Sequence, residues 1–472
     1  MASGSDDNEF TSFPKGRRAA DPRALDRLAT FESASSPSSS GEVGRGPAWS
    51  VLGAVVVPGG PSLFRRRGLS VFLLLFGVIA PLAMLAVAIV RRHTITSLVL
   101  DTGMLMTIQV VSALFVLTRL VAVVEAVRAR RPGSPMRGAA WLGALLVIGL
   151  IVPATWVVLR ARDLSSVIDE VFVSSGGNDA PLASGVSGDS DDDFTTVLLL
   201  GGDEGPGRWA LRTDTMILVF IHKPSGRIAM VSVPRNMYNV KFPPMTPMND
   251  AFPKGFKDLA NAIYPYVYTH PDVAEFYTRG DLQPEAIALA SALSFSMDIT
   301  IDDYVLVNMQ GFLEIIDALG GVTVNLDKEI PMPGNVPGAK HPYPATIGPG
   351  PVTMDGTVAL GFARSRSADS DYGRMGRQRQ LLTALATQTS GTDILTRFPQ
   401  ITDIMGWTVR TSLSTDEFGF LVDRLREGAS ITESFGLNPP LVNTGRPDWE
   451  AIAAFLRGVK DAVKNNYDFP YA

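Results

Sequence analysis

The chain contains no cysteine and only four histidines among its 472 residues. The lack of cysteine excludes disulfide bonds, thiolate metal sites and thiol catalysis. The histidines, at positions 93, 222, 270 and 341, are so widely scattered that a zinc site built on imidazoles is not expected. An excess of positive charge is also lacking, because the formal net charge is -5. Nucleic acid is therefore not a favoured partner, and we predict none.

Long apolar runs dominate the N-terminal third of the chain. Residues 1–48 come first; they are rich in Ser, Asp and Pro, and we predict a disordered cytoplasmic tail. Residues 49–160 follow as a membrane region with three predicted transmembrane helices, at about 69–90, 98–124 and 139–158. The first and third are close to the roughly 20 residues that cross a bilayer. The second is a weaker candidate, because Asp101 and Arg119 lie near its ends, from which both side chains could reach the membrane interface. These segments start too far from the first residue, and are too long, for a cleavable signal peptide.

Arginines flanking these segments predict their orientation. The arginine-rich flanks are Arg65, Arg66 and Arg67 before the first segment, and Arg128, Arg130, Arg131 and Arg137 between the second and third. The loop between the first two segments carries only Arg91 and Arg92. The positive-inside rule therefore places the N-terminus in the cytoplasm, and three crossings place everything after about residue 160 outside. We predict a multi-pass protein of the cell membrane with an extracellular C-terminal domain.

The C-terminal part reads as one large domain of residues 194–472, joined to the membrane region by a flexible acidic linker, residues 161–193. Short apolar runs predict strands, and amphipathic runs predict helices between and after them. The strands are expected at 196–200, 216–221, 227–233, 304–307 and 322–326, and the helices at 284–297, 309–319, 416–426 and 448–464. Residues 330–351 are rich in Pro and Gly and predict a loop. This alternation indicates the α/β class, with a central mixed sheet sandwiched by helices.

The most highly charged stretch of this domain runs from Leu360 to Leu381 and reads LGFARSRSADSDYGRMGRQRQL. Residues 358–363, just before its charges, predict a short buried strand, and a helix is expected after them. On a strand, Arg364 and Arg366 share a side. On the first turns of a helix, Arg374, Arg377 and Gln378 share a face. Guanidinium groups gathered at a strand end and a helix N-terminus favour a phosphate-binding site.

Further charges lie at the ends of the predicted strands: Asp203, then Arg212 with Asp214, then Arg235. Burying an unpaired charge is costly, so these residues must have partners. A structural network of ion pairs is one reading. A site for a pyrophosphate and a divalent cation is the other, with carboxylates holding the cation and arginines holding the phosphate oxygens.

The motifs LLLGGD (198–203), RTDT (212–215), SVPRN (232–236), NAIY (261–264), DALGGV (317–322) and FARSRSADSDYGRMGRQRQ (362–380) resemble the LytR-CpsA-Psr family of cell-wall enzymes. The resemblance implies a membrane-anchored phosphotransferase that moves a glycopolymer from a polyprenyl-pyrophosphate carrier onto a peptidoglycan hydroxyl, with Mg²⁺ or Mn²⁺ as cofactor. It also implies an apolar tunnel for the prenyl tail. One departure is Asn236, where the family usually has an aspartate that steadies the preceding arginine.

The resemblance also assigns roles to single residues. The implied metal ligands are Asp214, Asp371 and Asp203. The implied catalytic residues are Asp214, Asp371, Arg235 and Arg374. The implied pyrophosphate-binding residues are Arg212, Arg235, Arg364, Arg366, Arg374 and Gln378.

Three functions remain open at this point. The first is the transferase, acting on arabinogalactan, teichoic acid or capsule. The second is a polyprenyl-pyrophosphate pyrophosphatase, in which water replaces the acceptor. The third is a non-catalytic lipid-binding envelope or regulatory protein. Two aspartates among the arginines count against the third function, because arginines alone suffice to bind an anionic lipid.

Overall fold

The computed structural model describes residues 67–90, 102–128, 192–202, 212–366, 370–389, 408–426 and 431–470, with short pieces between 148 and 162, at 182–183 and between 397 and 406. The predicted cytoplasmic tail, residues 1–48, lies outside the described residues, and so does Asp203.

A six-stranded mixed sheet forms the centre of the C-terminal domain, in the order β10-β3-β2-β1-β4-β9. Its strands are β1 (Phe194–Gly202), β2 (Thr213–His222), β3 (Ile228–Ser232), β4 (Asp303–Asn308), β9 (Val409–Thr411) and β10 (Ile431–Gly436). β1 pairs antiparallel with β2 and parallel with β4. The apolar runs predicted as buried strands are β1, β2 and β3, and Leu198, Leu218 and Val231 have no exposed surface. The mixed central sheet is therefore confirmed.

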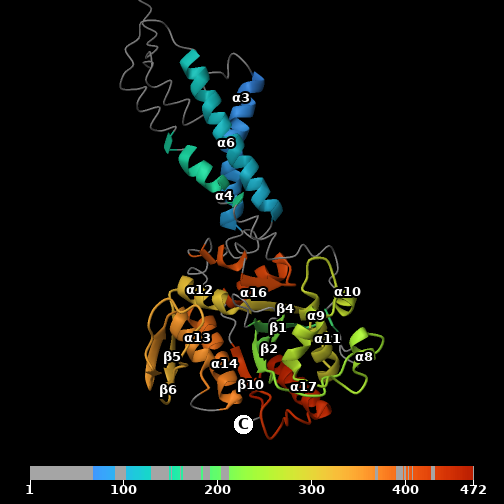
Figure 1. Ribbon diagram of the computed structural model, residues 1–472. Coiled ribbons are helices and arrows are strands. Elements are labelled where there is room, and N and C mark those ends of the chain that lie inside the picture. Colours follow the sequence, from blue (N-terminus) through green and yellow to red (C-terminus); the bar gives the residue numbers. More distant parts are fainter. Residues whose placement is uncertain are drawn as a thin grey trace, which may run out of the picture.

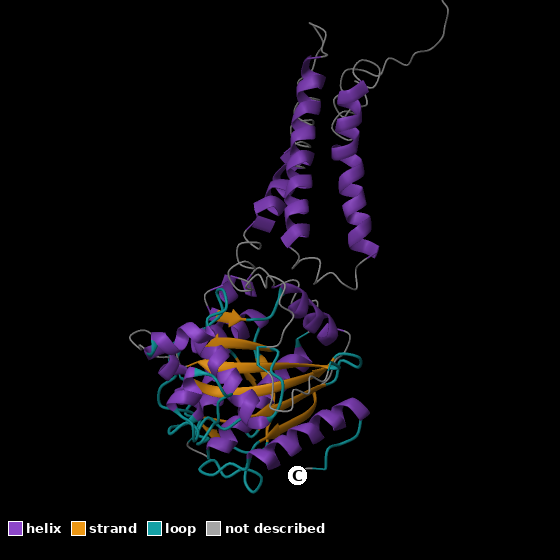
Figure 2. Cartoon of the chain, turned by 90° about the vertical axis from the view of Figure 1, so that its right-hand side faces the viewer, coloured by secondary structure: helices purple, strands orange, loops and turns teal. Residues whose placement is uncertain are grey.

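Helices cover both faces of this sheet (Figures 1 and 2). One face packs against α9 (Ile263–Thr269), α11 (Pro284–Met297) and α17 (Trp449–Asn465), in the largest apolar cluster of the domain. The smaller η3 (Ala260–Ala262), α8 (Pro247–Ala251) and α10 (Pro271–Tyr277) lie on the same side. The other face packs against α14 (Asp371–Gln388) and α16 (Thr415–Arg426). The predicted sandwich is confirmed, because apolar residues of the sheet contact helices on both sides.

A smaller layer stands beside this sandwich and contains α12 (Met309–Leu319) and α13 (Gly356–Arg364). It also contains the paired strands β5 (Val322–Leu326) and β8 (Gly350–Met354), and β6 (Ile330–Pro331) with β7 (Thr346–Ile347). The sequence-based prediction of a loop over 330–351 is therefore wrong in part, because three short strands lie in or overlap that range.

The predicted strand at 358–363 is also wrong, because these residues belong to α13. Asp355 caps this helix, and its side chain accepts a hydrogen bond from the backbone N–H of Val358. Ala359, Leu360 and Phe362 are buried, so the helix is apolar on nearly every side. A short apolar run of this kind has no periodicity that distinguishes a buried helix from a buried strand.

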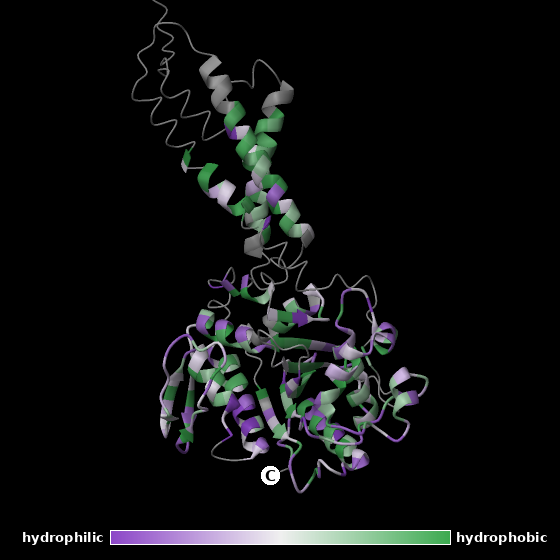
Figure 3. Cartoon of the chain, viewed as in Figure 1, coloured by the Kyte–Doolittle hydropathy of each residue, from purple (hydrophilic) through white to green (hydrophobic). Residues whose placement is uncertain are grey.

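The described part of the membrane region contains two helical segments that pack against each other. The first is continuous from α3 (Arg67–Leu74) through the π-helical turn η1 (Leu75–Ile79) to α4 (Ala80–Val90), and it runs towards the domain (Figure 1). The second, α6 (Thr102–Arg128), returns. Arg119 of α6 is buried, and its Nη2 donates to the carbonyl oxygen of Gly77 at 2.6 Å. Most of the described residues of both segments are hydrophobic, as their green colour shows (Figure 3).

Within the described residues, one helix is long and apolar enough to cross a membrane, at Gly103–Val121. The stretch Val71–Met84 is a shorter apolar helix. The third predicted segment is described only in pieces, with helix at 148–149 and 151–159. The count of three spans therefore stays a prediction.

Six residues of the predicted linker are described, and two of them, Leu182 and Ala183, are attached to the domain by backbone hydrogen bonds. The N–H of Leu182 donates to the carbonyl oxygen of Asp302 at 3.2 Å, and Ala183 exchanges backbone hydrogen bonds with Ile301. Leu182 is 7% exposed and belongs to the apolar cluster of α11 and α17. This point of the linker is thus fixed beside the start of β4.

Candidate active site

A pocket of about 810 Å³ lies between the central sheet and the helices α12, α13 and α14. Its inner wall is apolar and includes Leu199, Ile217, Val305, Leu360 and Leu382. Its polar part includes five arginines and a glutamine. The charged or amide residues that line it are Arg212, Asp214, Arg235, Asn308, Arg364, Arg366, Arg374 and Gln378. The pocket is therefore amphipathic, with room for an apolar chain next to an anion.

Asp214 owes its position to a bulge in the sheet. In the ladder between β1 and β2, Gly201 pairs with Thr215 and Gly202 pairs with Thr213, so Asp214 is the extra residue between them. A bulge redirects the side chain that it carries and often occurs next to active sites. Gly201 is required opposite it, because a Cβ there would lie 2.8 Å from the Cβ of Thr215.

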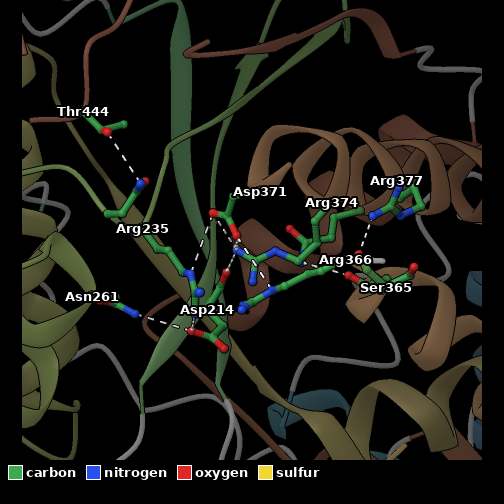
Figure 4. A network of polar contacts seen from close by, with 12 residues as sticks. Asp214, Arg235, Asn261, Ser365, Arg366, Asp371, Arg374, Arg377 and Thr444 are labelled. Carbon is green, nitrogen blue, oxygen red and sulfur yellow. Dashed lines mark hydrogen bonds and ion pairs between the residues drawn. The ribbon is translucent and has the colours of Figure 1, made fainter. Parts of the chain in front are cut away.

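Arg235 reaches Asp214 from the turn that follows β3. Its Nη1 donates to Oδ1 of Asp214, and its Nε lies 3.8 Å from Oδ2 of Asp371 (Figure 4). The backbone of this turn is held by η3, because the N–H of Asn261 donates to the carbonyl oxygen of Arg235 at 3.1 Å. One guanidinium group therefore lies between the two carboxylates that the sequence singled out.

Asp371 and Arg374 lie in the first turn of α14, so the predicted helix start is confirmed. Nη2 of Arg374 lies 3.0 Å from Oδ1 and 3.1 Å from Oδ2 of Asp371, and it also donates to the backbone oxygen of Asp214 at 3.2 Å. The side chain of Arg374 is only 4% exposed. Burial, together with the guanidinium groups of Arg235 and Arg366, lowers the pKa of Arg374 to about 10, against the opposing effect of Asp371. Arg374 therefore stays charged at neutral pH.

The remaining predicted anion ligands converge on the same pocket. Arg212 immediately precedes β2, Arg364 ends α13, and Gln378 lies one turn after Arg374. Arg366 follows α13; its side chain is half exposed, with its Nε 4.0 Å from Oδ1 of Asp371. The prediction that Arg364 and Arg366 share one side of a strand is wrong, because Arg364 ends α13 and Arg366 follows it. Their convergence on the pocket is nevertheless as expected.

Two other arginines of α14 have structural contacts outside the pocket. Arg377 is buried and donates to the carbonyl oxygens of Phe362 and Ser365, so it fastens α14 to the end of α13 instead of sharing the face of Arg374. Arg379 donates to the hydroxyls of Ser232 at 2.7 Å and Ser434 at 3.1 Å, which joins α14 to β3 and β10. Burial lowers the pKa of Arg379 to about 10.

Sequence reasoning assigned no role to Asn261, which the structure places in the site. Its side chain is 2% exposed, and its Nδ2 lies 3.4 Å from Oδ1 of Asp214 (Figure 4). The nearby Asn236 directs its Nδ2 towards the hydroxyl of Thr444, at 3.5 Å. The amide oxygens of both asparagines are buried, and neither has a hydrogen-bond partner among the residues that the structure describes. Asn261 was detectable as a polar residue inside the apolar run LANAIY, where a buried amide requires a partner.

The residues of this site fit a magnesium ion. Mg²⁺ is usually held by one or two carboxylates, with waters and substrate phosphates completing its shell. Asp214 and Asp371 offer those two carboxylates, and Asn261, whose Nδ2 lies 3.4 Å from Oδ1 of Asp214, has an amide oxygen without a hydrogen-bond partner among the described residues. Within the described residues, no group of three or more His, Cys, Asp or Glu side chains gathers as a closed metal site. The donor set therefore suits a cation that shares its shell with a ligand.

Comparison with known proteins gives a family match and several distant relatives. The model of the LytR_cpsA_psr family matches residues 173–434. The chain is 29% identical over 294 residues to the polyisoprenyl-teichoic acid–peptidoglycan teichoic acid transferase TagU of Oceanobacillus iheyensis, covering 60% of this chain and 79% of that protein. It is 27% identical to the protein of the same name from Bacillus subtilis, covering 58% of this chain and 78% of that one. A crystal structure of a Streptococcus agalactiae protein aligns with a TM-score of 0.44 at 22% identity, covering 58% of this chain and 89% of that chain.

Proposed function

The chain belongs to the LytR-CpsA-Psr family, and on that premise we propose that it transfers a glycopolymer from a polyprenyl-pyrophosphate carrier to a peptidoglycan hydroxyl. The observation that carries the proposal is the amphipathic pocket. Five arginines against two aspartates leave an excess of positive charge at one end, and aliphatic residues line the rest. A diphosphate bearing a prenyl chain matches both halves, because guanidinium forks bind phosphate oxygens and aliphatic walls bind hydrocarbon.

The carrier's diphosphate would lie among Arg212, Arg364 and Arg366, with Arg374 and Gln378 on the α14 side. Buried Arg374 is held by Asp371, so its charge is fixed in place before substrate binds. Preorganised positive charge of this kind stabilises charge that develops on phosphate oxygens during transfer. The first prenyl units would lie along Leu199, Val305 and Leu382, and the pocket volume falls within the range of about 300–1,000 Å³ typical of small-molecule sites.

Transfer then requires only positioning of the acceptor. The acceptor hydroxyl attacks the phosphorus atom that carries the glycopolymer, and the bridging P–O bond breaks. Polyprenyl phosphate leaves with the electron pair, and the proton of the hydroxyl passes to the departing phosphate oxygen. A divalent cation held by Asp214 and Asp371 would neutralise charge on the diphosphate. The apolar inner wall of the pocket keeps water away from the prenyl end of the carrier. The relatives named as teichoic acid transferases support this class of polymer, and their names support peptidoglycan as the acceptor.

The test follows a label from donor to product. The full chain in detergent is incubated with a lipid-linked glycopolymer labelled in its sugar, with peptidoglycan and Mg²⁺. The proposal requires label on peptidoglycan, loss of transfer in excess chelator and recovery with Mg²⁺ or Mn²⁺. Asp214→Asn should abolish transfer while the thermal unfolding profile stays that of the parent. Label released only as free sugar phosphate would identify a pyrophosphatase, and no turnover despite donor binding would identify a binding protein.

A further inference from the structure

We infer that the guanidinium group of Arg235 and a divalent cation compete for the same two carboxylates, so that cation binding releases Arg235 towards the diphosphate. This inference rests on the proposed function, because it concerns the cation and the diphosphate of that site. It assigns to Arg235 a step that the other arginines of the pocket do not perform.

The first observation is the place that Arg235 occupies. Its Nη1 contacts Oδ1 of Asp214, and its Nε lies 3.8 Å from Oδ2 of Asp371. The two carboxylates come from different elements, β2 and α14, and Arg235 bridges them across the polar part of the pocket (Figure 4). A cation that bridged both carboxylates would have to occupy the space between them, where the guanidinium group of Arg235 now lies. The two positive groups therefore exclude each other, at least at Asp214.

The second observation is that Arg235 is fixed at its backbone and free to turn at its side chain. Its carbonyl oxygen accepts from Asn261, while its side chain is 22% exposed and lines the pocket. The next residue, Asn236, directs its amide to Thr444, and no hydrogen bond between Asn236 and Arg235 occurs in the part of the chain that the structure describes. The two carboxylates are thus what holds the guanidinium group in its present position.

Arg374 provides the contrast that makes Arg235 the mobile partner. Its side chain is 4% exposed, and Nη2 contacts both oxygens of Asp371 and the backbone oxygen of Asp214. A cation approaching from the pocket can displace the more exposed Arg235 without unburying Arg374. Arg235 then turns into the pocket, where its positive charge becomes available to a phosphate oxygen. Cation loading and diphosphate binding are coupled as a consequence, and the coupling is reciprocal.

Direct binding of Mn²⁺ tests the competition. The full chain in detergent is titrated with Mn²⁺, without donor or acceptor, and electron paramagnetic resonance measures the concentration of free Mn²⁺. The titration compares the parent with Arg235→Met and Arg366→Met. Arg366 is the matched control, since it also faces Asp371, at 4.0 Å, but does not contact Asp214. If the bridge is closed for nine-tenths of the time, Arg235→Met should bind Mn²⁺ about tenfold more tightly than the parent. Arg366→Met should gain only the smaller effect of removing one nearby positive charge.

Arg235→Lys provides a second, milder variant in case the methionine variant does not fold. Lysine keeps the charge but lacks the fork that spans two carboxylates, so its Mn²⁺ affinity should lie between those of the parent and Arg235→Met. If the parent binds Mn²⁺ and loses it in Asp214→Asn, but the Arg235 variants gain no more than Arg366→Met, the competition is refuted and the metal site stands. If no variant binds Mn²⁺, the metal part of the proposed function fails, and the competition fails with it.

Discussion

Asp214, Arg235 and Arg374 show how much of the site can be predicted from single residues of the sequence. Asp214 and Arg235 were singled out as charges at the ends of apolar runs, where a charge requires a partner or a ligand, and Arg374 as a charge at a predicted helix start. The pairing among them was not predictable in the same way. Asp214 is aimed by a bulge in which β2 has one residue more than β1, and strand periodicity alone does not reveal a bulge. Asn261 was missed because its role depends on η3 meeting the turn after β3, which is a tertiary contact.

At the residue scale, the arginines of α14 can be separated by replacing the guanidinium fork with an ammonium group. Arg374→Lys keeps the charge but loses the planar group that contacts Asp371 and the Asp214 backbone together. We expect it to weaken binding of a short-chain prenyl pyrophosphate by about 1–3 kcal/mol, and Arg366→Lys to weaken it in the same direction. The measurement is titration calorimetry of the purified full chain at fixed salt.

Arg379→Lys is the matched control for this comparison. Arg379 contacts Ser232 and Ser434 and does not line the pocket, so its replacement should lower the melting temperature and leave diphosphate affinity unchanged. Equal affinity of the parent, Arg366→Lys and Arg374→Lys would show that fork geometry has no role in binding.

At the scale of elements, the sequence predicted the long periodic segments well and the short apolar ones poorly. The boundaries expected for α11, α12 and β5 agree with the structure to the residue. The run at 358–363 was assigned to a strand, although Asp355 followed by Gly356 is a helix-start signal that deserved more weight. β9 and β10 at the sheet edges are short, and pairing with β4 and β3 rather than local pattern defines them.

The start of β4 predicts a pH dependence of stability. Burial, with further contributions from Glu417 of α16 and from Asp302, raises the pKa of Asp303 to about 7, although the hydroxyl of Ser412 donates to its carboxyl group at 2.8 Å. The folded state then holds a proton that the unfolded chain has already lost above about pH 4. Stability should therefore fall as pH rises from about 4 to 7 and level off above that, by on the order of 4 kcal/mol for this group.

Asp303→Asn isolates this effect because an amide cannot ionise and can keep the Ser412 contact. Its melting temperature should be close to that of the parent at pH 5 and higher than that of the parent at pH 8. Asp281→Asn, in an exposed turn before α11, serves as the control. Its difference in melting temperature from the parent should be the same at pH 5 and pH 8. If the difference between Asp303→Asn and the parent is the same at both pH values, the carboxyl group of Asp303 does not titrate in this range.

At the scale of the whole molecule, the directions of the two described helical segments bear on the predicted topology, and the three crossings stay a prediction. The first segment runs from α3 through α4 towards the domain, and α6 leads back, so the end of α4 and the start of α6 lie nearer the domain than the start of α3 and the end of α6 do (Figure 1). The start of α3 and the end of α6 thus share the side away from the domain, and in the sequence the arginine-rich stretches adjoin these two helix ends. The positive-inside rule predicts that this side is cytoplasmic. The contact of Arg119 with Gly77 at the π-helical turn satisfies a carbonyl group inside this pair.

The side of the membrane on which the domain lies can be tested with fusion proteins and with protease. If both arginine-rich ends are cytoplasmic, a third crossing between about 139 and 158 must carry the chain back to the domain side. Alkaline phosphatase fused after Ala472 should then be active in intact cells, whereas a fusion in the loop near Arg131 should be inactive. Protease added to spheroplasts should cut the linker near Ser187 and release a fragment that contains the domain. An inactive Ala472 fusion together with an active Arg131 fusion would invert the topology and would place the proposed site on the side away from peptidoglycan.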